Sequence, residues 1–429
     1  MTEDFLAYIW KFQYFNKENL RTAGNEELVV LKPGNLNTNA GPDFQQASIR
    51  INDIVWVGSV EFHVKASNWQ RHAHTTDGKY DQVILHVVWE NDATVLRTDQ
   101  TPVPVLALKE LVSPNLLQTY QNLKKAKAAI PCEAFLPTVP AITKTFMLER
   151  VLLERLEEKA QRIREIYRHS GNNWEETLYK IMLVGFGFKI NQNGFSKLAQ
   201  ALPFKILQKH QYESLQTEAL LFGQAGFLAE NHTDPYLLQL RREYLFLKHK
   251  YDLPPALQPS DWNFLRLRPA NFPTVRLSQL AVLISARPHW FSTLTGNLRL
   301  KELEAFFKVN PSGYWQKHYM PEREANFKIG ALGKSSVHLL LINVVAPLLV
   351  AYAREMDQPA LVEKALHLLE ALPPEKNHIL EAFQQMGFEN KSAAQSQGLL
   401  SLGQNYCQPV HCLQCAIGNS ILKRSKTAA

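Results

Sequence analysis

The residues best suited to chemistry lie in one stretch of the chain, and three of them alternate along a run typical of a β-strand. Glu61, His63 and Lys65 are separated from one another by single apolar residues. Because successive side chains of a strand point to opposite faces, these three share one face. A solvated surface strand shows the same alternation, so the pattern fits either a site or an exposed face.

A second carboxylate is expected beside this face. Asp43 follows Gly41-Pro42, where the proline ring fixes φ and begins the next strand. The strand after Asp43 and the strand that holds Glu61 are joined through Asn52-Asp53, a turn-forming pair that predicts a hairpin. Asp43 and Glu61 would therefore lie on neighbouring strands.

Two carboxylates on adjacent strands form an oxygen-rich site that suits Mg²⁺ or Mn²⁺. Such an ion lowers the pKa of a bound water and neutralises the charge that develops on a phosphate during phosphodiester cleavage. A nearby histidine or lysine would orient or deprotonate that water. The expected catalytic residues are Asp43, Glu61, His63 and Lys65, with Asp43 and Glu61 as the metal ligands.

Four of the fourteen histidines fall in the short interval from His63 to His86. His86 interrupts an apolar run typical of an interior strand, and we expect it to be a buried, hydrogen-bonded core residue. His72 and His74 follow a tryptophan in a polar stretch, where loop histidines also occur by chance. A hydrolase that uses a transition metal is a rival interpretation, with the ligands Glu61, His63, His72 and His74.

Three of the four cysteines crowd near the C-terminus at intervals that suit a metal. Cys407, Cys412 and Cys415 are separated by four and two residues, so their thiolates can converge on Zn²⁺ or an iron–sulfur cluster. Cys132 or His411 would complete the ligand set. We expect Cys132, Cys407, Cys412 and Cys415 to form a site for zinc or an iron–sulfur cluster, with idle buried thiols as the alternative.

The remaining pattern predicts an α+β chain of two domains. A helix over 2–15 has apolar residues at helical spacing, and four strands follow it, near 28–31, 44–51, 55–65 and 82–89. Helical patterns dominate from residue 143 onward. We therefore expect an N-terminal α/β domain with a mixed sheet (1–130), a proline-marked linker (131–142) and an all-helical domain that carries the cysteine cluster (143–429).

Composition sets further limits. A hydrophobic content of 45% supports large cores, and a net charge of +7 permits nucleic-acid binding by counterion release, although many other proteins share this charge. No run of eighteen uncharged apolar residues occurs and the N-terminus lacks a basic region, so we expect neither a transmembrane helix nor a signal peptide. A cytoplasmic location without membrane association is the resulting expectation.

The motif Pro42-Asp43, seventeen residues, then Glu61-x-His63 resembles the signature of the PD-(D/E)XK nuclease superfamily. The order of a helix, three strands, a helix and a strand is similar too. The resemblance implies a nuclease-like domain with Asp43 and Glu61 as metal ligands. His63 stands where the family has lysine, and Lys65, one step further along the same face, is the substitute to consider.

The expected function is therefore metal-dependent phosphodiester hydrolysis, with DNA as the nucleic acid. A non-catalytic nucleic-acid-binding or scaffold protein on a degenerate nuclease fold is the alternative, in which His63 marks lost catalysis. Some nucleases of this superfamily carry an iron–sulfur centre on one remote and three C-terminal cysteines. The cysteines here look similar, except that Cys132 follows both carboxylates instead of preceding them.

Nearly the whole chain also resembles an uncharacterised bacterial family, domain of unknown function 2851, which implies no activity. The similarity is carried by Gly41–Phe44, Gly58–His63, Leu85–Val88, Arg266–Pro273 and Cys412–Gly418. Arg266 and Arg268, close to aromatic residues, are suited to a phosphate backbone or to carboxylates, and equally to pairing with acidic groups of the protein itself.

Overall fold

In the computed structural model, which describes residues 1–229 and 232–427, the chain divides into two units. Unit 1 combines Met1–Leu148 with Ser401–Ala429, and unit 2 consists of Glu149–Leu400. Helices α4 (Ala141–His169) and α17 (Ala393–Leu402) run across the two boundaries. The C-terminal cysteines therefore belong to the unit that contains the sheet, whereas the sequence pattern grouped them with the helices.

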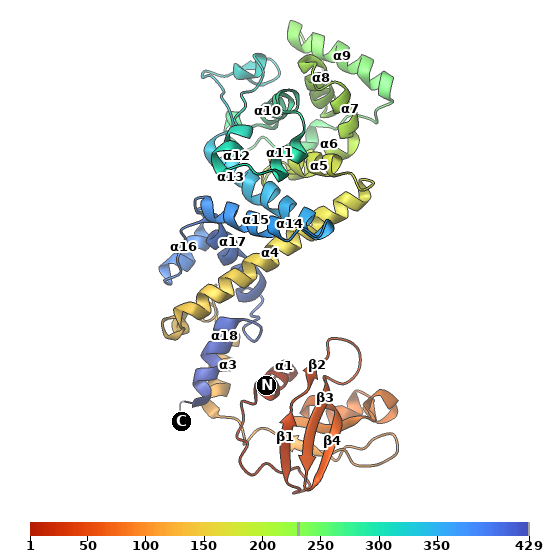
Figure 1. Ribbon diagram of the computed structural model, residues 1–429, viewed down its shortest axis with the longest axis vertical. Helices are drawn as coiled ribbons and strands as arrows, with labels where there is room; N and C mark the ends of the chain where they lie inside the picture. The colour runs from red at the N-terminus through yellow and green to blue at the C-terminus, as the bar shows by residue number, and fades with distance from the viewer. Residues whose placement is uncertain (230–231, 428–429) are drawn as a thin grey trace. The chain divides into compact units, whose positions relative to one another are not determined.

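A six-stranded mixed sheet forms the centre of unit 1 (Figure 1). Its order is β1-β3-β4-β5-β6, and β2 pairs with β3. The pairs β1–β3 and β3–β4 are antiparallel, whereas β4–β5 and β5–β6 are parallel. The strands are β1 (Leu28–Lys32), β2 (Asn35–Leu36), β3 (Phe44–Ile51), β4 (Ile54–Lys65), β5 (Val83–Glu90) and β6 (Val105–Ala107).

The β3–β4 hairpin turns at the expected pair of residues. Asn52 adopts a φ of 50°, a conformation that asparagine tolerates better than most residues, and Ile51 pairs with Ile54 across the turn. A Cβ at Gly58 would lie 2.6 Å from the backbone oxygen of Gln82, so this glycine permits the close approach of the chain just before β5.

Helix α1 (Glu3–Phe12) packs against the sheet and covers one of its faces (Figure 1). The Thr2 side chain caps it by accepting a hydrogen bond from the Phe5 N–H, as its position before the helix predicts. Trp10 is fully buried and meets Phe62 of β4 edge-on, with ring centroids 6.1 Å apart. Burial of these aromatic rings stabilises the sheet by several kcal/mol, at ~3–5 kcal/mol for each large aromatic side chain.

The opposite face of the sheet is covered by the short connection from β4 to β5. This connection contains α2 (Asn68–Arg71), η1 (His74–Thr76) and η2 (Gly78–Tyr80). Trp69 anchors it: the ring is fully buried and its Nε1–H donates to the Leu96 carbonyl at 3.1 Å. Because Phe62 faces α1, its strand neighbours Glu61 and His63 face this connection.

Unit 1 also contains helices from two later parts of the chain. They are α3 (Pro114–Lys125), η3 (Glu133–Thr138), the first turns of α4, the π-helical turn η8 (Gly403–Cys407) and α18 (Ala416–Thr427). Tyr120 of α3 stacks on Phe5 of α1 with ring centroids 3.8 Å apart, and its hydroxyl shares a 2.9 Å hydrogen bond with Thr2. Helix α18 packs against α3 and η3, so the C-terminal segment contributes to this unit's core.

Unit 2 is mostly helical, and the expectation of an all-helical region was wrong in one detail. Strands β7 (His318–Met320) and β8 (Arg323–Glu324) form a small antiparallel hairpin. The helices are α5 (Trp174–Phe186), α6 (Gln192–Ala201), α7 (Phe204–Lys209), α8 (Ser214–Gln224), α9 (Pro235–Tyr251), η4 (Pro259–Asp261), η5 (Pro269–Asn271), α10 (Pro273–Ala286), α11 (Trp290–Thr295), α12 (Leu300–Phe306), η6 (Tyr314–Gln316), α13 (Lys334–Leu340), η7 (Leu341–Val345), α14 (Ala346–Glu355), α15 (Ala360–Ala371) and α16 (His378–Gln385).

One helical stretch in the described part of the chain, Lys334–Glu355, is long and apolar enough to cross a membrane. It runs continuously through α13, η7 and α14. Of its most apolar window, 78% is buried inside the structure, as in the core helix of a soluble protein.

Candidate functional site

Asp43 and Glu61 lie side by side where β3 begins. Phe44 pairs with Val60, which sets Asp43 beside Glu61 on the next strand. The Asp43 N–H donates to Glu61 Oε2 at 3.0 Å, and the Phe62 N–H donates to Asp43 Oδ2 at 3.1 Å. The structure therefore brings together the two carboxylates that the sequence assigned to neighbouring strands.

Both carboxyl groups are held in an environment that disfavours their charge. Burial raises the pKa of Glu61 to about 8, and the negative charge of Asp43 adds to this effect. Burial also raises the pKa of Asp43 to about 6, although the hydrogen bond from the Phe62 N–H opposes the shift. Glu61 therefore keeps its proton at neutral pH, and a positive charge beside the pair would favour the release of that proton.

Three histidine rings form a hydrogen-bonded chain beside the carboxylates. His86 of β5 pairs in register with Glu61 of β4, and its Nε2 lies 2.8 Å from Nδ1 of His63. The other ring nitrogen of His63, Nε2, lies 3.0 Å from Nδ1 of His72. His63 and His86 are buried and His72 is exposed, so the chain of rings leads from the core to the surface.

The buried end of this chain fixes its direction. His86 Nδ1 is buried without a hydrogen-bond partner. An unpaired buried N–H is rarer than an unpaired acceptor, so the proton of His86 resides on Nε2. His86 then donates to His63, and His63 donates to His72. Burial, with the neighbouring rings of the cluster, lowers the pKa of His63 and of His86 to about 3, which keeps both rings neutral.

His74 connects the ring chain to the carboxylates. Its Nε2 lies 3.5 Å from Glu61 Oε1 and is buried without a hydrogen-bond partner. The ring stacks on Tyr80 at a centroid distance of 3.7 Å. Ring nitrogens of His63, His72 and His74 lie within 4.8 Å of one another, close enough to share one metal ion.

Lys65 lies one step beyond His63 on the same face of β4. It is exposed at the end of β4 and pairs in register with Glu90. Four residues along a strand span ~13 Å, so Lys65 lies well beyond Glu61 on the same face. Of the four residues expected to act in catalysis, Asp43 and Glu61 are joined by hydrogen bonds, Glu61 and His63 both lie beside His74, and Lys65 is exposed at the end of the strand.

Two contributions were not expected from the sequence. His86 is buried and hydrogen-bonded as predicted, but its partner is His63, which makes it part of the cluster. Tyr80 supports His74 by stacking, and no spacing signal marked it. The positive φ of Ala73, 60°, lets the chain turn between His72 and His74 so that both rings reach the cluster.

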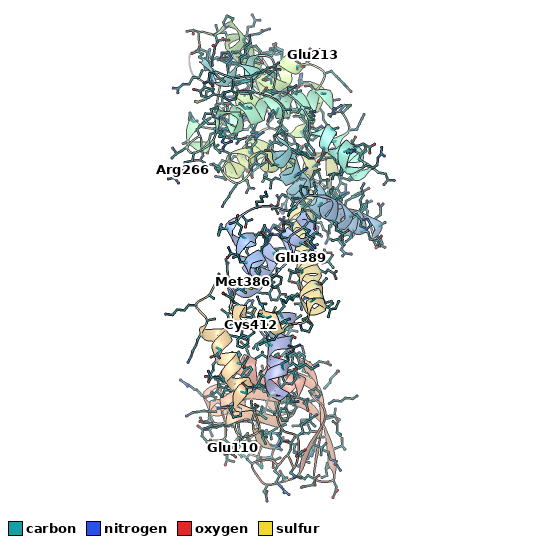
Figure 2. All side chains as sticks on the ribbon, turned by 90° about the vertical axis from the view of Figure 1, so that its left-hand side faces the viewer. Glu110, Glu213, Arg266, Met386, Glu389 and Cys412 are labelled. Atoms are coloured by element: carbon teal, nitrogen blue, oxygen red, sulfur yellow. The ribbon has the colours of Figure 1, made fainter. Side chains whose placement is uncertain are left out.

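The four cysteines also gather within unit 1, away from the carboxylates in sequence. All four are buried, each 7% or 8% exposed, and none of these four cysteines forms a disulfide. Cys407 closes the π-helical turn η8, and Cys412 and Cys415 lie just before α18 (Cys412 is labelled in Figure 2). A Cβ at Gly418 would lie 2.1 Å from the Cys412 carbonyl oxygen, so only glycine lets α18 start this close to the cysteine loop.

Cys132 joins this loop from the other end of the unit's sequence. Burial raises the pKa of Cys132 to about 12, and the nearby thiol groups of Cys415 and Cys412 add to the shift. The pKa of Cys407 is raised by burial and then by the thiol group of Cys132. The thiol groups of the two segments therefore lie near one another, and the metal that the sequence suggests for them stays a prediction.

Arg266 and Arg268 are exposed and lie in the segment that leads into α10 (Arg266 is labelled in Figure 2). Arg266 adopts a positive φ of 63°. Within the described residues neither arginine lies within ion-pair distance of a carboxylate of the chain, so pairing with internal acidic groups does not account for them.

No curated protein and no solved structure matches this chain. One family does match, by residues 3–378, a range that includes the carboxylates and the histidine cluster and ends before Cys407. The chain therefore belongs to the family described as Protein of unknown function (DUF2851).

Proposed function

We propose that the chain is a metal-dependent phosphodiesterase that cleaves nucleic acid, with DNA as the substrate. The observation that carries the proposal is the pairing of Asp43 with Glu61 next to neutral histidine rings. The order of elements supports it: a helix, three antiparallel strands, a short helix and a parallel strand. This is the order that the resemblance to PD-(D/E)XK nucleases implies.

The residues present fit a divalent cation. Asp43 and Glu61 would hold Mg²⁺ or Mn²⁺. Each carboxyl group uses one oxygen in a backbone hydrogen bond, which leaves the other oxygen for the ion. His74 Nε2, buried and without a partner 3.5 Å from Glu61, is a further donor. When bound, such an ion supplies an activated water and neutralises charge on the phosphate.

The histidine chain would move the proton of the attacking water. His63 occupies the position where the nuclease superfamily has lysine. Both of its ring nitrogens are hydrogen-bonded, so Nδ1 would exchange the hydrogen bond from His86 for one from the water before it accepts the proton. His72 is exposed and hydrogen-bonded to His63, so it is the ring that exchanges protons with solvent. Arg71 and Lys79 are exposed on the same connection and offer positive charge to the phosphate backbone.

The test is cleavage of DNA in the presence of Mn²⁺ by the parent protein and three variants. Asp43→Asn and Glu61→Gln should lower the rate by roughly 10²–10³-fold, the range for loss of one electrostatic stabiliser. Asp53→Asn is the matched control, because Asp53 is an exposed acidic residue at the turn of the same hairpin. If the first two variants cut as fast as the parent, the proposal fails. DNA binding without cleavage by the parent identifies the non-catalytic alternative.

A second candidate assigns the metal to imidazoles. His63, His72 and His74 bring their ring nitrogens within 4.8 Å, and the 3.0 Å separation of His63 and His72 is close to the ~3.3 Å between two ligands of one tetrahedral zinc ion. The ring chain would have to break to admit that ion. Stoichiometric Zn²⁺ that survives loss of the cysteines and is lost in His74→Ala favours this candidate.

We also propose that Cys132, Cys407, Cys412 and Cys415 hold a structural metal, either Zn²⁺ or an iron–sulfur cluster. Thiols with raised pKa values lose their protons to a soft metal, and the binding free energy then stabilises the fold. Protein purified without oxygen should contain zinc or show visible absorbance. Cys132→Ser should release the metal; if it does not, His411 is the fourth ligand. If protein purified without oxygen contains no metal, the proposal of a metal site at the cysteines is wrong.

A further inference from the structure

A cavity of about 240 Å³ opens in unit 2, and the segment that stood out in the sequence forms part of its wall. Leu267, Asn271 and Pro273 line it from the Arg266–Pro273 segment. Apolar side chains provide most of the remaining wall, and Arg276 and Ser336 provide polar atoms. The cavity is smaller than the ~300–1,000 Å³ typical of sites for drug-sized ligands, so it suits a small molecule.

Arg276 is the unusual feature of this cavity. Its side chain is only 4% exposed, although a guanidinium is charged at neutral pH. The Nη1–H donates to Gln279 Oε1 at 2.8 Å, and Nη2–H groups donate to Asn271 Oδ1 at 2.6 Å and to Ser336 Oγ at 3.5 Å. All three partners are neutral, and Nε is buried without a partner.

No carboxylate among the described residues lies within ion-pair distance of Arg276. Burial lowers the pKa of Arg276 to about 10, which still leaves the group charged at neutral pH. The Phe188 ring, 4.9 Å from the guanidinium carbon, supplies a weak cation–π contact. A buried charge with neutral partners alone is destabilising, and a bound anion would remove that cost.

The turn over residues 187–191, which forms another part of the cavity wall, has a fixed conformation. A Cβ at Gly187 would lie 2.7 Å from the Asn191 backbone, and Phe188 adopts a positive φ of 45°. Asn191 is buried and exchanges two hydrogen bonds with the Asn263 backbone, at 2.9 and 2.8 Å. These contacts hold the 187–191 turn in place without a ligand, so the cavity is pre-formed.

We infer that this cavity binds a small organic anion, whose carboxylate or phosphate group pairs with Arg276 and whose apolar body contacts the aromatic wall. The positive charge of the guanidinium favours either oxyanion, and a charge-assisted hydrogen bond to the anion strengthens the contact. The exposed Lys189, which also lines the cavity, adds positive charge for the approach of the anion. The inference is independent of the proposed nuclease activity, since all of these residues belong to unit 2.

The test uses the full chain and three probes: benzoate, phenyl phosphate and the neutral benzyl alcohol. Benzoate or phenyl phosphate should raise the melting temperature and bind in calorimetry, and benzyl alcohol should do neither. The better of the two anions identifies the oxyanion that the site prefers. Failure of both anions to bind the parent protein overturns the inference.

Two variants distinguish specific binding in this cavity from nonspecific attraction of anions to a positively charged protein. Arg276→Gln should weaken binding by about tenfold or more, because it removes a charge-assisted contact. Arg268→Gln, an exposed arginine of the neighbouring segment that does not line the cavity, should bind like the parent. Equal weakening by both variants, or by neither, overturns the inference.

Asn271→Asp keeps the test decisive if Arg276→Gln does not fold. The new carboxylate would lie where Asn271 Oδ1 now accepts from Arg276 at 2.6 Å, and would act as a built-in counter-ion. The melting temperature without ligand should therefore rise and the response to the anion should disappear. Anion binding that persists unchanged in Asn271→Asp overturns the inference.

Discussion

The histidine–carboxylate cluster and the cysteine cluster both lie in unit 1, but the fold assembles them in different ways. Asp43, Glu61 and His63 lie within one hairpin, so strand register alone brings them together. The cysteines come from a loop after α3 and from the last part of the chain, so only the packing of α18 on α3 and η3 unites them. Strand register predicts which residues of one hairpin are neighbours. Contacts between distant segments of the chain depend on tertiary packing, which the sequence pattern does not show.

The two clusters should also differ in what their loss does. The first is built from histidine rings and buried carboxyl groups, and we propose that it binds a cation and a substrate, so its variants should change activity. The second consists of buried thiols that contribute to the core, so its variants should change stability. The following predictions test this division, from the largest expected effect to the smallest.

His63→Ala should lower the rate of DNA cleavage by roughly 10²–10⁴-fold, the usual contribution of a general acid–base group. The variant removes the ring that connects His86 with His72. Lys65→Ala is the matched comparison: Lys65 is exposed and lies beyond Glu61 on the strand, so its loss should cost little. A large loss in Lys65→Ala with none in His63→Ala would show that the lysine is the catalytic base.

Cys412→Ser should lower the melting temperature by about 5–10 °C, which corresponds to a few kcal/mol for a unit of this size. The physical reason is that metal-binding free energy is also folding free energy. Cleavage per folded molecule should remain close to that of the parent at low temperature. Unchanged melting in Cys412→Ser, measured by circular dichroism together with metal analysis, would contradict a structural role.

Stability of the chelator-treated protein should fall as the pH rises from about 6.5 to about 8. Glu61 has a pKa of about 8 in the folded protein against an ordinary value of 4.5, so it binds more protons when folded. Its contribution is complete below 4.5 and is lost as the pH rises through 8. The neutral rings of His63 and His86 act in the opposite direction, but only below their ordinary value of 6.5.

Urea unfolding of the parent and of Glu61→Gln at both ends of this pH range measures the effect. The parent should lose stability toward the higher pH, and Glu61→Gln should be nearly flat because the amide does not titrate. Parallel pH profiles for the two proteins would mean that the carboxyl of Glu61 is not buried in its neutral form.

The sequence predicts a site residue well where local structure alone positions it, and poorly where distant parts of the chain do. The turn at Asn52-Asp53 and the alternation along β4 were enough to place Asp43, Glu61 and His63 together. The ring chain could not be predicted, because it depends on the parallel register of β4 and β5 and on the turn at Ala73.

The same limit applies to unit 2. The sequence suggested Arg266 and Arg268 as anion-binding residues because they lie near aromatic residues, yet both are exposed. The buried arginine is Arg276, inside an apolar helical pattern in which nothing local marks a charge without a counter-ion. The small hairpin β7–β8 was missed for a related reason, since strands of three and two residues are too short to show a period.

Titration calorimetry with Mn²⁺ tests most directly the central claim that Asp43 and Glu61 hold a divalent ion. The parent at neutral pH should bind one ion at this site and release protons, because the pKa of Glu61 is about 8 and ligands must lose their protons. Repeating the titration in buffers of different ionisation enthalpy counts those protons. Asp43→Asn and Glu61→Gln should lose the binding and Asp53→Asn should keep it. Mn²⁺ binding that is equal in all four proteins, or absent from the parent, would contradict the account.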